Sequence, residues 1–292
     1  MTRVDALRQP LTALFGFAIA SLLLLAVVAI GSAVAVAVYA LYAQIPLQDL
    51  ADDPLVAMTP TIMGGSALCQ AVGMGLVTVF LARWTTDTAE SRSDALFGPV
   101  RPGPWMYWVA GGVGGLTVGF LPGWIASAIL QELPELGGTL EALSKTLLEP
   151  DPVGKSLLVL AICGGAPLFE ELAFRGYVWH HLERIAPGWV VWIATSLVFA
   201  FYHVDPVQSP SLIPTALFLG FLRWRSGSVG PCILAHFVNN ALATVSLLSI
   251  GAESEGSISL AAASAGMAFS ILCCLVAFAV ERRTRFQPGT PP

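Results

Sequence analysis

The sequence predicts an all-α membrane protein, a polytopic bundle of about eight transmembrane helices. Of its 292 residues, 55% are apolar and only 11% are charged, whereas soluble domains usually contain about 25% charged residues. Long apolar runs recur along the whole chain, and the basic residues gather between alternate runs. No basic patch is interleaved with aromatic residues, which argues against nucleic-acid binding. We therefore expect one integral membrane domain over residues 1–292.

A helix needs about 20 mainly apolar residues to cross a bilayer. The first apolar run far exceeds the roughly 7–15 residues of a signal-peptide core, so we expect a span that tilts or projects from the membrane. The fifth and sixth runs are short, and Pro206, Pro210 and Pro214 lie near their junction. The predicted spans are 11–43, 61–83, 105–130, 155–179, 189–205, 210–225, 229–250 and 258–280.

The distribution of charge predicts the orientation of these spans. Cytoplasmic loops of membrane proteins are enriched in Lys and Arg, and eight spans with an inside N-terminus place most of the basic residues on one side. Both termini are then cytoplasmic, and residues 282–292 are expected to form a disordered basic cytoplasmic tail. The basic residues on this side are Arg3, Arg8, Arg83, Arg92, Arg101, Arg184, Arg223, Arg225, Arg282, Arg283 and Arg285.

Three charged residues interrupt the fourth apolar run, in the stretch "LFEELAFRGY". Ionisable residues inside a span are costly, so they usually face a cavity and carry function. Glu171 and Arg175 are four residues apart and can pair on one helix face. Glu170 lies about 100° around the axis, so we expect it to remain freer and to face a wetter pocket, where it could act as a base. "CGGAP", just upstream, is expected to thin or kink the helix and so to let the backbone of another helix approach.

Two later spans add polar side chains of the kind that hydrolytic sites use. His203 closes the fifth span, where it could hold a water or a metal ion opposite Glu170. His236 and Asn240 share a face of the seventh span and could donate hydrogen bonds to an oxyanion. Asn239 points elsewhere and reads as a helix-contact residue. If the fifth span runs straight across the membrane from its first residue, His203 lies nearer the outer side of the membrane than the other groups.

Structural interpretations of the same residues stay open at this stage. Glu171 and Arg175 could form only a buried ion pair, and His236 with Asn240 could join two helices. His203 could be a satisfied packing residue. His180 and His181 end the fourth span, where we expect them to reach toward the interface rather than to bind metal. The five cysteines form no CxxC pair and read as apolar packing residues.

The ordered motifs Glu170-Glu171-x-x-x-Arg175, Phe199-x-x-x-His203 and His236-x-x-x-Asn240 resemble those of the CPBP intramembrane proteases. These are relatives of the CAAX prenyl endopeptidase, also called the Abi family. The similarity covers residues 155–250, which we interpret as the catalytic core. It implies a membrane-embedded endopeptidase that cuts peptide bonds near the membrane.

The resemblance also implies a role for each residue. Glu170 and His203 would activate the hydrolytic water, His236 and Asn240 would stabilise the oxyanion, and Glu171 with Arg175 would support the site. Members are often labelled metalloproteases, so Glu170, His203 and His236 are possible Zn²⁺ ligands. The chain has no HExxH motif, and we favour a glutamate-activated water without metal.

The substrate is expected to be a membrane-anchored peptide or protein. The amino-acid composition, rich in Ala, Gly, Val and Arg, indicates a bacterial inner-membrane protein, for which prenylated substrates are not expected. Peptide maturation, self-immunity to a bacteriocin and processing of a membrane tail all remain open. Two other functions are an ion-coupled transporter, which would require repeated halves, and a non-catalytic scaffold or immunity protein.

Overall fold

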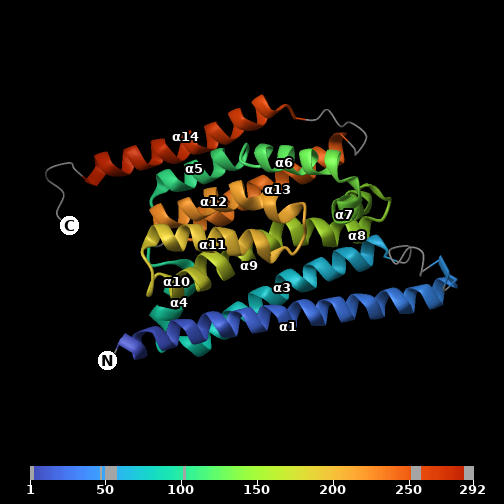
Figure 1. Cartoon of the computed structure of the whole chain (residues 1–292), viewed down its shortest axis with the longest axis horizontal. Coiled ribbons are helices and arrows are strands. Elements are labelled where there is room, and N and C mark those ends of the chain that lie inside the picture. Colours follow the sequence, from blue (N-terminus) through green and yellow to red (C-terminus); the bar gives the residue numbers. More distant parts are fainter. Residues whose placement is uncertain (1–2, 47, 50–57, 101–102, 251–257, 286–292) are drawn as a thin grey trace.

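The computed structural model describes residues 3–46, 48–49, 58–100, 103–250 and 258–285. Within these ranges the regular structure is helical and no strand occurs. The helices form one bundle with their axes roughly along its long direction (Figure 1). The predicted polytopic helical fold is confirmed.

Six helical stretches are long and apolar enough to cross a membrane, among the described residues. The predicted fifth and sixth spans are also helices, α11 (Gly188–Tyr202) and α12 (Gln208–Ser226), but α11 is shorter and α12 is not among the six. The six stretches are α1 (Arg3–Ala43), α3 (Pro60–Thr85), α5 and α6 (Trp105–Gly115 and Phe120–Glu132), α8 to α10 (Pro152–Leu182), α13 (Gly230–Ile250) and α14 (Leu260–Arg285).

The first helix, α1, has 41 residues and so a length of about 60 Å, twice the roughly 30 Å hydrocarbon core. The last helix, α14, continues to Arg285. The first four residues of the predicted 282–292 tail are therefore helical, and the remainder lies outside the described residues. The start of α1 and the end of α14 lie at the same end of the bundle (Figure 1), as the alternating charge pattern requires.

The chain from Pro152 to Leu182 is one long helix with two wide turns. It runs through α8 (Pro152–Val159), the π-helical segment η2 (Leu160–Gly165), α9 (Ala166–Glu171), the π-helical segment η3 (Leu172–Val178) and α10 (Trp179–Leu182). Single π-turns within α-helices occur frequently at functional sites. The two glutamates end the short α-helical piece between these wide turns.

Glycines allow two helices to approach their neighbours closely. A Cβ atom on Gly165 would lie 2.8 Å from Cβ of Ala71 on α3, and one on Gly115 would lie 2.8 Å from the carbonyl oxygen of Ala235 on α13. Neither position has room for a larger side chain. The expectation that "CGGAP" lets another helix approach is met at Gly165, and the distortion there is a π-turn rather than a sharp kink.

The α11–α12 hairpin is short, and its turn ends part-way along the bundle (Figure 1). Asp205 begins α12 because its Oδ1 accepts the N–H groups of Val207 at 2.9 Å and Gln208 at 2.7 Å. Val204, next to His203, has a φ of 49°, a backbone conformation that is unusual for a β-branched residue. This turn holds His203 deeper in the bundle than expected for a straight fifth span.

Three shorter helices lie in the loops, namely α4 (Ala89–Phe97), η1 (Pro134–Gly137) and α7 (Gly138–Leu148). Helix α7 was not predicted from the sequence. Its apolar Leu140, Leu143 and Leu147 recur at helical spacing, and Leu147 is buried. An aromatic core joins α1 to the helix that carries the glutamates, where Phe17 lies 5.8 Å from both Phe174 and Tyr177 between ring centroids.

Asp151 connects the start of α8 to the start of α3, outside the spans. Its Oδ1 accepts the N–H groups of Val153 and Gly154 at 3.0 Å, and its Oδ2 accepts the Thr61 hydroxyl at 2.8 Å. The N–H of Gly154 and the Thr61 hydroxyl are the main groups that lower the pKa of Asp151 below its ordinary value of 3.8.

We predict that Asp151→Ala lowers thermal stability at neutral pH, and that the difference from wild type disappears in acid. Because the folded pKa is lowered, the carboxylate stabilises the fold fully above pH 3.8 and loses this contribution as the pH falls through the folded pKa. Thermal unfolding across this pH range measures the effect. Asp151→Asn, which retains a capping oxygen, is the control and should flatten the pH dependence. An unchanged pH profile in Asp151→Ala would contradict this assignment.

Candidate active site

Pro167 leaves one backbone carbonyl in the fourth span without its helical donor. The N–H of Ala166 donates to the carbonyl of Ala161, five residues earlier, as in a π-helix. The next bond in this register would run from residue 167 to Ile162, but proline has no N–H. Nδ2 of Asn240 supplies the missing donor, 2.9 Å from the Ile162 oxygen. Pro167 thereby frees the Ile162 carbonyl, and the bond from Asn240 to this carbonyl joins the widened helix to α13.

Asn240 is held on its other side by Asn239, whose Nδ2 donates to the Asn240 Oδ1 over 3.3 Å. The Asn239 side chain also lies directly against Gly119, where α6 begins. Asn239 is thus a helix-contact residue, as predicted. Asn240 retains one amide hydrogen beyond its bond to Ile162, since a carboxamide has two N–H donors.

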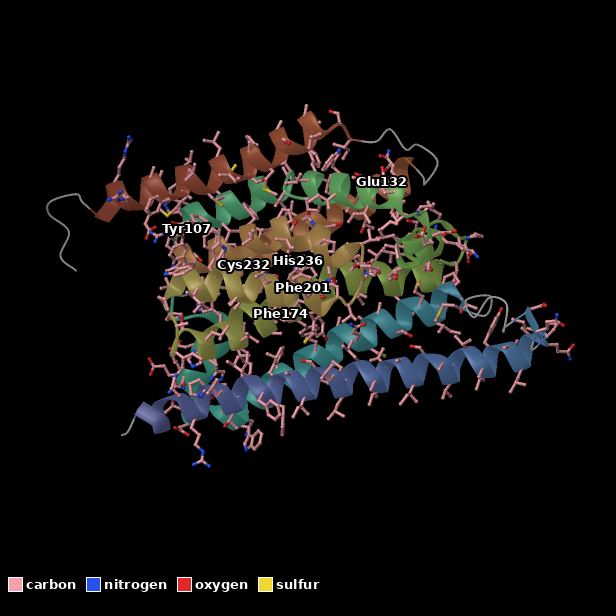
Figure 2. The ribbon with its side chains drawn as sticks, in the orientation of Figure 1. Tyr107, Glu132, Phe174, Phe201, Cys232 and His236 are labelled. Carbon is pink, nitrogen blue, oxygen red and sulfur yellow. The ribbon has the colours of Figure 1, made fainter. Side chains whose placement is uncertain are left out.

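Glu171 is the centre of a buried charged cluster. Arg175 Nη1 lies 3.0 Å from Glu171 Oε1, and His236 Nδ1 lies 2.9 Å from the same oxygen. Glu171 and Arg175 are fully buried and His236 is 6% exposed. The predicted pairing of Glu171 with Arg175 is present. His236, which the sequence grouped only with Asn240, also binds Glu171. Figure 2 shows His236 in the middle of the bundle.

Arg175 extends this cluster to α11 and α12. Its Nη2 donates to the carbonyl oxygen of Ala216 on α12 at 3.1 Å, and its guanidinium carbon lies 4.1 Å from the centre of the Phe199 ring on α11. Planar guanidinium groups combine several fixed donors with stacking on aromatic faces. Because one side chain makes all these contacts, Arg175 fixes the positions of three helices.

The Phe199 ring packs between the two predicted site histidines and the helix that carries the glutamates. Its ring centroid lies 5.3 Å from that of His203, 5.9 Å from that of His236 and 5.5 Å from that of Phe174. Phe174 follows the glutamates, and His236 lies on α13. The fourth, fifth and seventh predicted spans therefore converge at the depth of Phe199.

Hydrogen bonds to the two histidines assign their ring nitrogens. His203 Nδ1 lies 3.1 Å from the carbonyl oxygen of Phe199, and a carbonyl can only accept, so Nδ1 carries the hydrogen. His236 Nδ1 likewise faces the carboxylate oxygen of Glu171. In their neutral forms both rings then leave Nε2 as an acceptor.

Glu170 differs from its neighbour in having no hydrogen-bond or ion-pair partner among the described residues. It is partly buried, one position before the fully buried Glu171. Phe169, the residue before it, packs directly on Gly75 of α3, which fixes this turn of the helix. The Tyr202 hydroxyl on α11 lies within electrostatic range of Glu170. The two adjacent carboxylates thus have separate environments, as their positions around the helix predict.

The described residues contain no group of three His, Cys, Asp or Glu side chains placed to hold a metal ion. The possible ligand set Glu170, His203 and His236 does not form such a group, and structural and catalytic zinc sites take at least three protein ligands. No chemical step below is assigned to a zinc ion.

Two residues lie elsewhere than the sequence indicated. Arg223, counted among the topology-setting arginines, is only 2% exposed; its Nε donates to the Arg175 carbonyl at 2.8 Å, and its guanidinium lies over Trp179. His181 is fully buried rather than reaching to the interface, with Nε2 3.3 Å from the Thr85 hydroxyl. The sequence carried no signal for either, because a backbone carbonyl and a distant threonine are their partners.

Comparison with protein families identifies the segment that holds this cluster. Residues 152–242 match the family model of the Rce1-like type II CAAX prenyl endopeptidases. The matched Rce1-like segment contains both glutamates, Arg175, His203, His236 and Asn240, and confirms the resemblance to the CPBP proteases. It covers less than half of the chain, and it supports a CAAX-type intramembrane protease family and peptidase activity in general. Neither the curated proteins nor the solved structures gave a match.

We predict that Arg175→Ala destabilises the protein by about 3–5 kcal/mol, because it leaves the buried Glu171 carboxylate without its counter-charge. Unfolding in denaturant, followed by tryptophan fluorescence, measures the loss. Lys145→Ala is the matched control, since Lys145 pairs with Glu149 at the same spacing but is 74% exposed. It should change stability by less than about 1 kcal/mol. Equal losses in the two variants would show that the buried pair has no special structural role.

Proposed function

We propose that this chain is an intramembrane endopeptidase that hydrolyses peptide bonds of membrane-associated substrates with a water activated by Glu170. The observation that carries the proposal is the contrast between two adjacent carboxylates inside an apolar bundle. Glu171 is bonded through Oε1 to the Arg175 guanidinium and the His236 imidazole, whereas Glu170 has no bonded partner among the described residues. An unpaired membrane carboxylate is costly unless it has a chemical use.

Glu170 is assigned the role of general base and His203 that of its partner on the water. The water oxygen attacks the scissile carbonyl carbon while its proton passes to the Glu170 carboxylate. Nε2 of His203, left as an acceptor by the bond from Nδ1 to Phe199, orients the second hydrogen of the water. When the carbon–nitrogen bond breaks, Glu170 returns the proton to the leaving amine, so that atoms and charge balance.

Asn240 and His236 are assigned to the tetrahedral oxyanion. Asn240 has one amide hydrogen left after its bond to Ile162, and it is held in place by Asn239. His236 can donate from Nε2 only when its ring carries a second proton, and Glu171 would then be its counter-ion. Preorganised donors of this kind lower the barrier because they need no reorientation during the reaction.

The substrate and the location follow the sequence predictions. We assign the chain to the cell membrane as a multi-pass protein, with both termini cytoplasmic and a bacterial origin. The substrate class is a membrane-anchored peptide or protein; maturation, self-immunity and tail processing are all compatible with an acid-and-histidine site that cuts near the bilayer.

We predict that Glu170→Gln and His203→Ala each lower cleavage by at least about a hundredfold, because each removes a group that activates the water. Comparative peptidomics of cells lacking the gene, complemented with wild type or variant, measures this and identifies the substrate. Glu141→Gln, an exposed glutamate of α7, is the control and should behave as wild type. Normal product levels with Glu170→Gln would remove Glu170 from the mechanism.

The metal question has a separate test, since the proposed chemistry uses protein groups alone. We expect membranes containing the wild-type protein to retain cleavage of the substrate found by peptidomics after treatment with a zinc chelator. Activity is followed by mass spectrometry of the products before chelation, after it and after Zn²⁺ is added back. Loss of activity with recovery on Zn²⁺ addition would replace the glutamate–water scheme with a metal-dependent one.

A further inference from the structure

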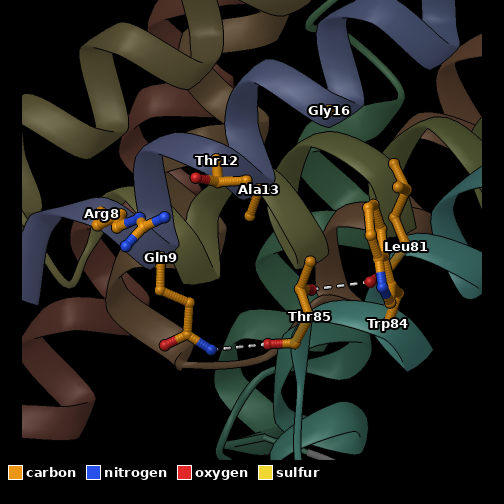
Figure 3. A pocket seen from close by; sticks show the side chains of 8 residues that line it. All are labelled: Arg8, Gln9, Thr12, Ala13, Gly16, Leu81, Trp84 and Thr85. Atoms are coloured by element: carbon orange, nitrogen blue, oxygen red, sulfur yellow. Dashed lines mark hydrogen bonds between the residues drawn. The ribbon is translucent and has the colours of Figure 1, made fainter. Parts of the chain in front are cut away.

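A cavity of about 400 Å³ lies between α1 and α3, away from the glutamate site. Figure 3 shows the side chains that surround it. It is located at the end of the bundle where α1 starts and α14 ends, since Arg8 is near the start of α1 and Thr85 ends α3. The lining residues are Arg8, Gln9, Thr12, Ala13, Gly16, Leu81, Trp84 and Thr85.

The cavity wall changes from polar to apolar along the helices. Arg8, Gln9 and Thr12 form the polar part on α1, and one turn deeper the lining is Gly16 on α1 and Leu81 on α3. Arg8 is the second residue of the apolar span that begins at Leu7, so its guanidinium lies at one end of that span. Trp84, 72% exposed, lies at the same level, where tryptophans mark the membrane–water interface.

The walls are held in place by hydrogen bonds. Gln9 Nε2 donates to the Thr85 carbonyl at 3.1 Å and so joins α1 to α3 at the edge of the cavity, as Figure 3 shows. The Tyr177 hydroxyl donates to the Ala13 carbonyl at 3.4 Å, and the Thr85 hydroxyl lies 3.3 Å from the Tyr177 hydroxyl. Deeper in the bundle, Leu24 of α1 packs on Gly73 of α3. The cavity is therefore a fixed space between two contact points.

Arg8 is available for a ligand. Its side chain is exposed, and no hydrogen bond or ion pair of its guanidinium occurs among the described residues. A guanidinium binds phosphate oxygens strongly and with two parallel hydrogen bonds. Basic pockets between transmembrane helices at headgroup depth suit the phosphate of a lipid.

We propose that this cavity binds one anionic phospholipid, with its phosphate at Arg8 and an acyl chain along Gly16 and Leu81. The order of the lining, a cation at the interface followed by apolar groups toward the membrane interior, matches the order of groups in a phospholipid. A lipid fits this order better than a soluble anion, which would leave the apolar half unoccupied. The site is independent of the proposed peptidase chemistry.

Two substitutions separate the two halves of the proposed site. Arg8→Gln removes the charge, whereas Arg8→Lys retains it. Gly16→Leu fills the apolar half, because a Cβ atom on Gly16 meets nothing within 4 Å. The matched controls are Arg83→Gln, an exposed arginine on α3 outside the cavity lining, and Gly31→Leu, a second α1 position with open space around Cβ.

Native mass spectrometry of the purified full-length protein, titrated with phosphatidylglycerol or phosphatidylcholine, measures the binding. We expect wild type, Arg8→Lys, Arg83→Gln and Gly31→Leu to retain one phosphatidylglycerol in preference to phosphatidylcholine. Arg8→Gln should lower phosphatidylglycerol affinity by about fivefold, the effect of one basic residue near the membrane surface. Gly16→Leu should lose the bound lipid of either class.

Three results would overturn the proposal. The first is equal retention of both lipids by wild type. The second is an equal decrease in Arg8→Gln and Arg83→Gln, which would mean general attraction to the basic end of the bundle. The third is unchanged binding by Gly16→Leu, which would place the lipid elsewhere. Gel filtration of each variant confirms its folded state. Arg8→Gln tests the phosphate half of the site and Gly16→Leu tests the apolar half, so a contrary result with either substitution overturns the proposal.

Discussion

A carboxylate buried inside an apolar helical bundle must be compensated by its neighbours, and the compensation of Glu171 determines much of this structure. Arg175 and His236 both bind one of its oxygens, and Arg175 continues to the Ala216 carbonyl and the Phe199 ring. These contacts come from α11, α12 and α13. Because the cost of a broken buried pair is several kcal/mol, the four helices cannot shift independently of Glu171.

The same constraint separates the two adjacent glutamates. With Glu171 committed to Arg175 and His236, the helix is fixed in rotation and Glu170 projects about 100° away. The binding of His236 and His203 through Nδ1 leaves Nε2 as the acceptor on each neutral ring. A structural cluster thus orients the groups that the proposed chemistry uses, although Glu171 and Arg175 take no part in the proton transfers.

Much of this architecture could be predicted from the sequence, where local rules apply. Length and hydropathy gave the helical spans, and the spacing of Glu171 and Arg175 gave their pairing. The first π-turn, η2, could not be predicted, because the loss of a donor at Pro167 is stable only when Asn240, more than 70 residues later, reaches the Ile162 carbonyl. The burial of Arg223 has a similar cause, since its partner is the backbone carbonyl of Arg175.

The central claim is that Glu171 couples the fourth span to α13 through His236. A double-mutant cycle with Glu171→Gln, His236→Ala and the double variant tests it most directly, with the free energy of unfolding as the readout. The account predicts a coupling energy within the roughly 0.5–3 kcal/mol range of contacting residues. Additive effects of the two substitutions, with a coupling energy near zero, would show that this bond does not hold the helices together.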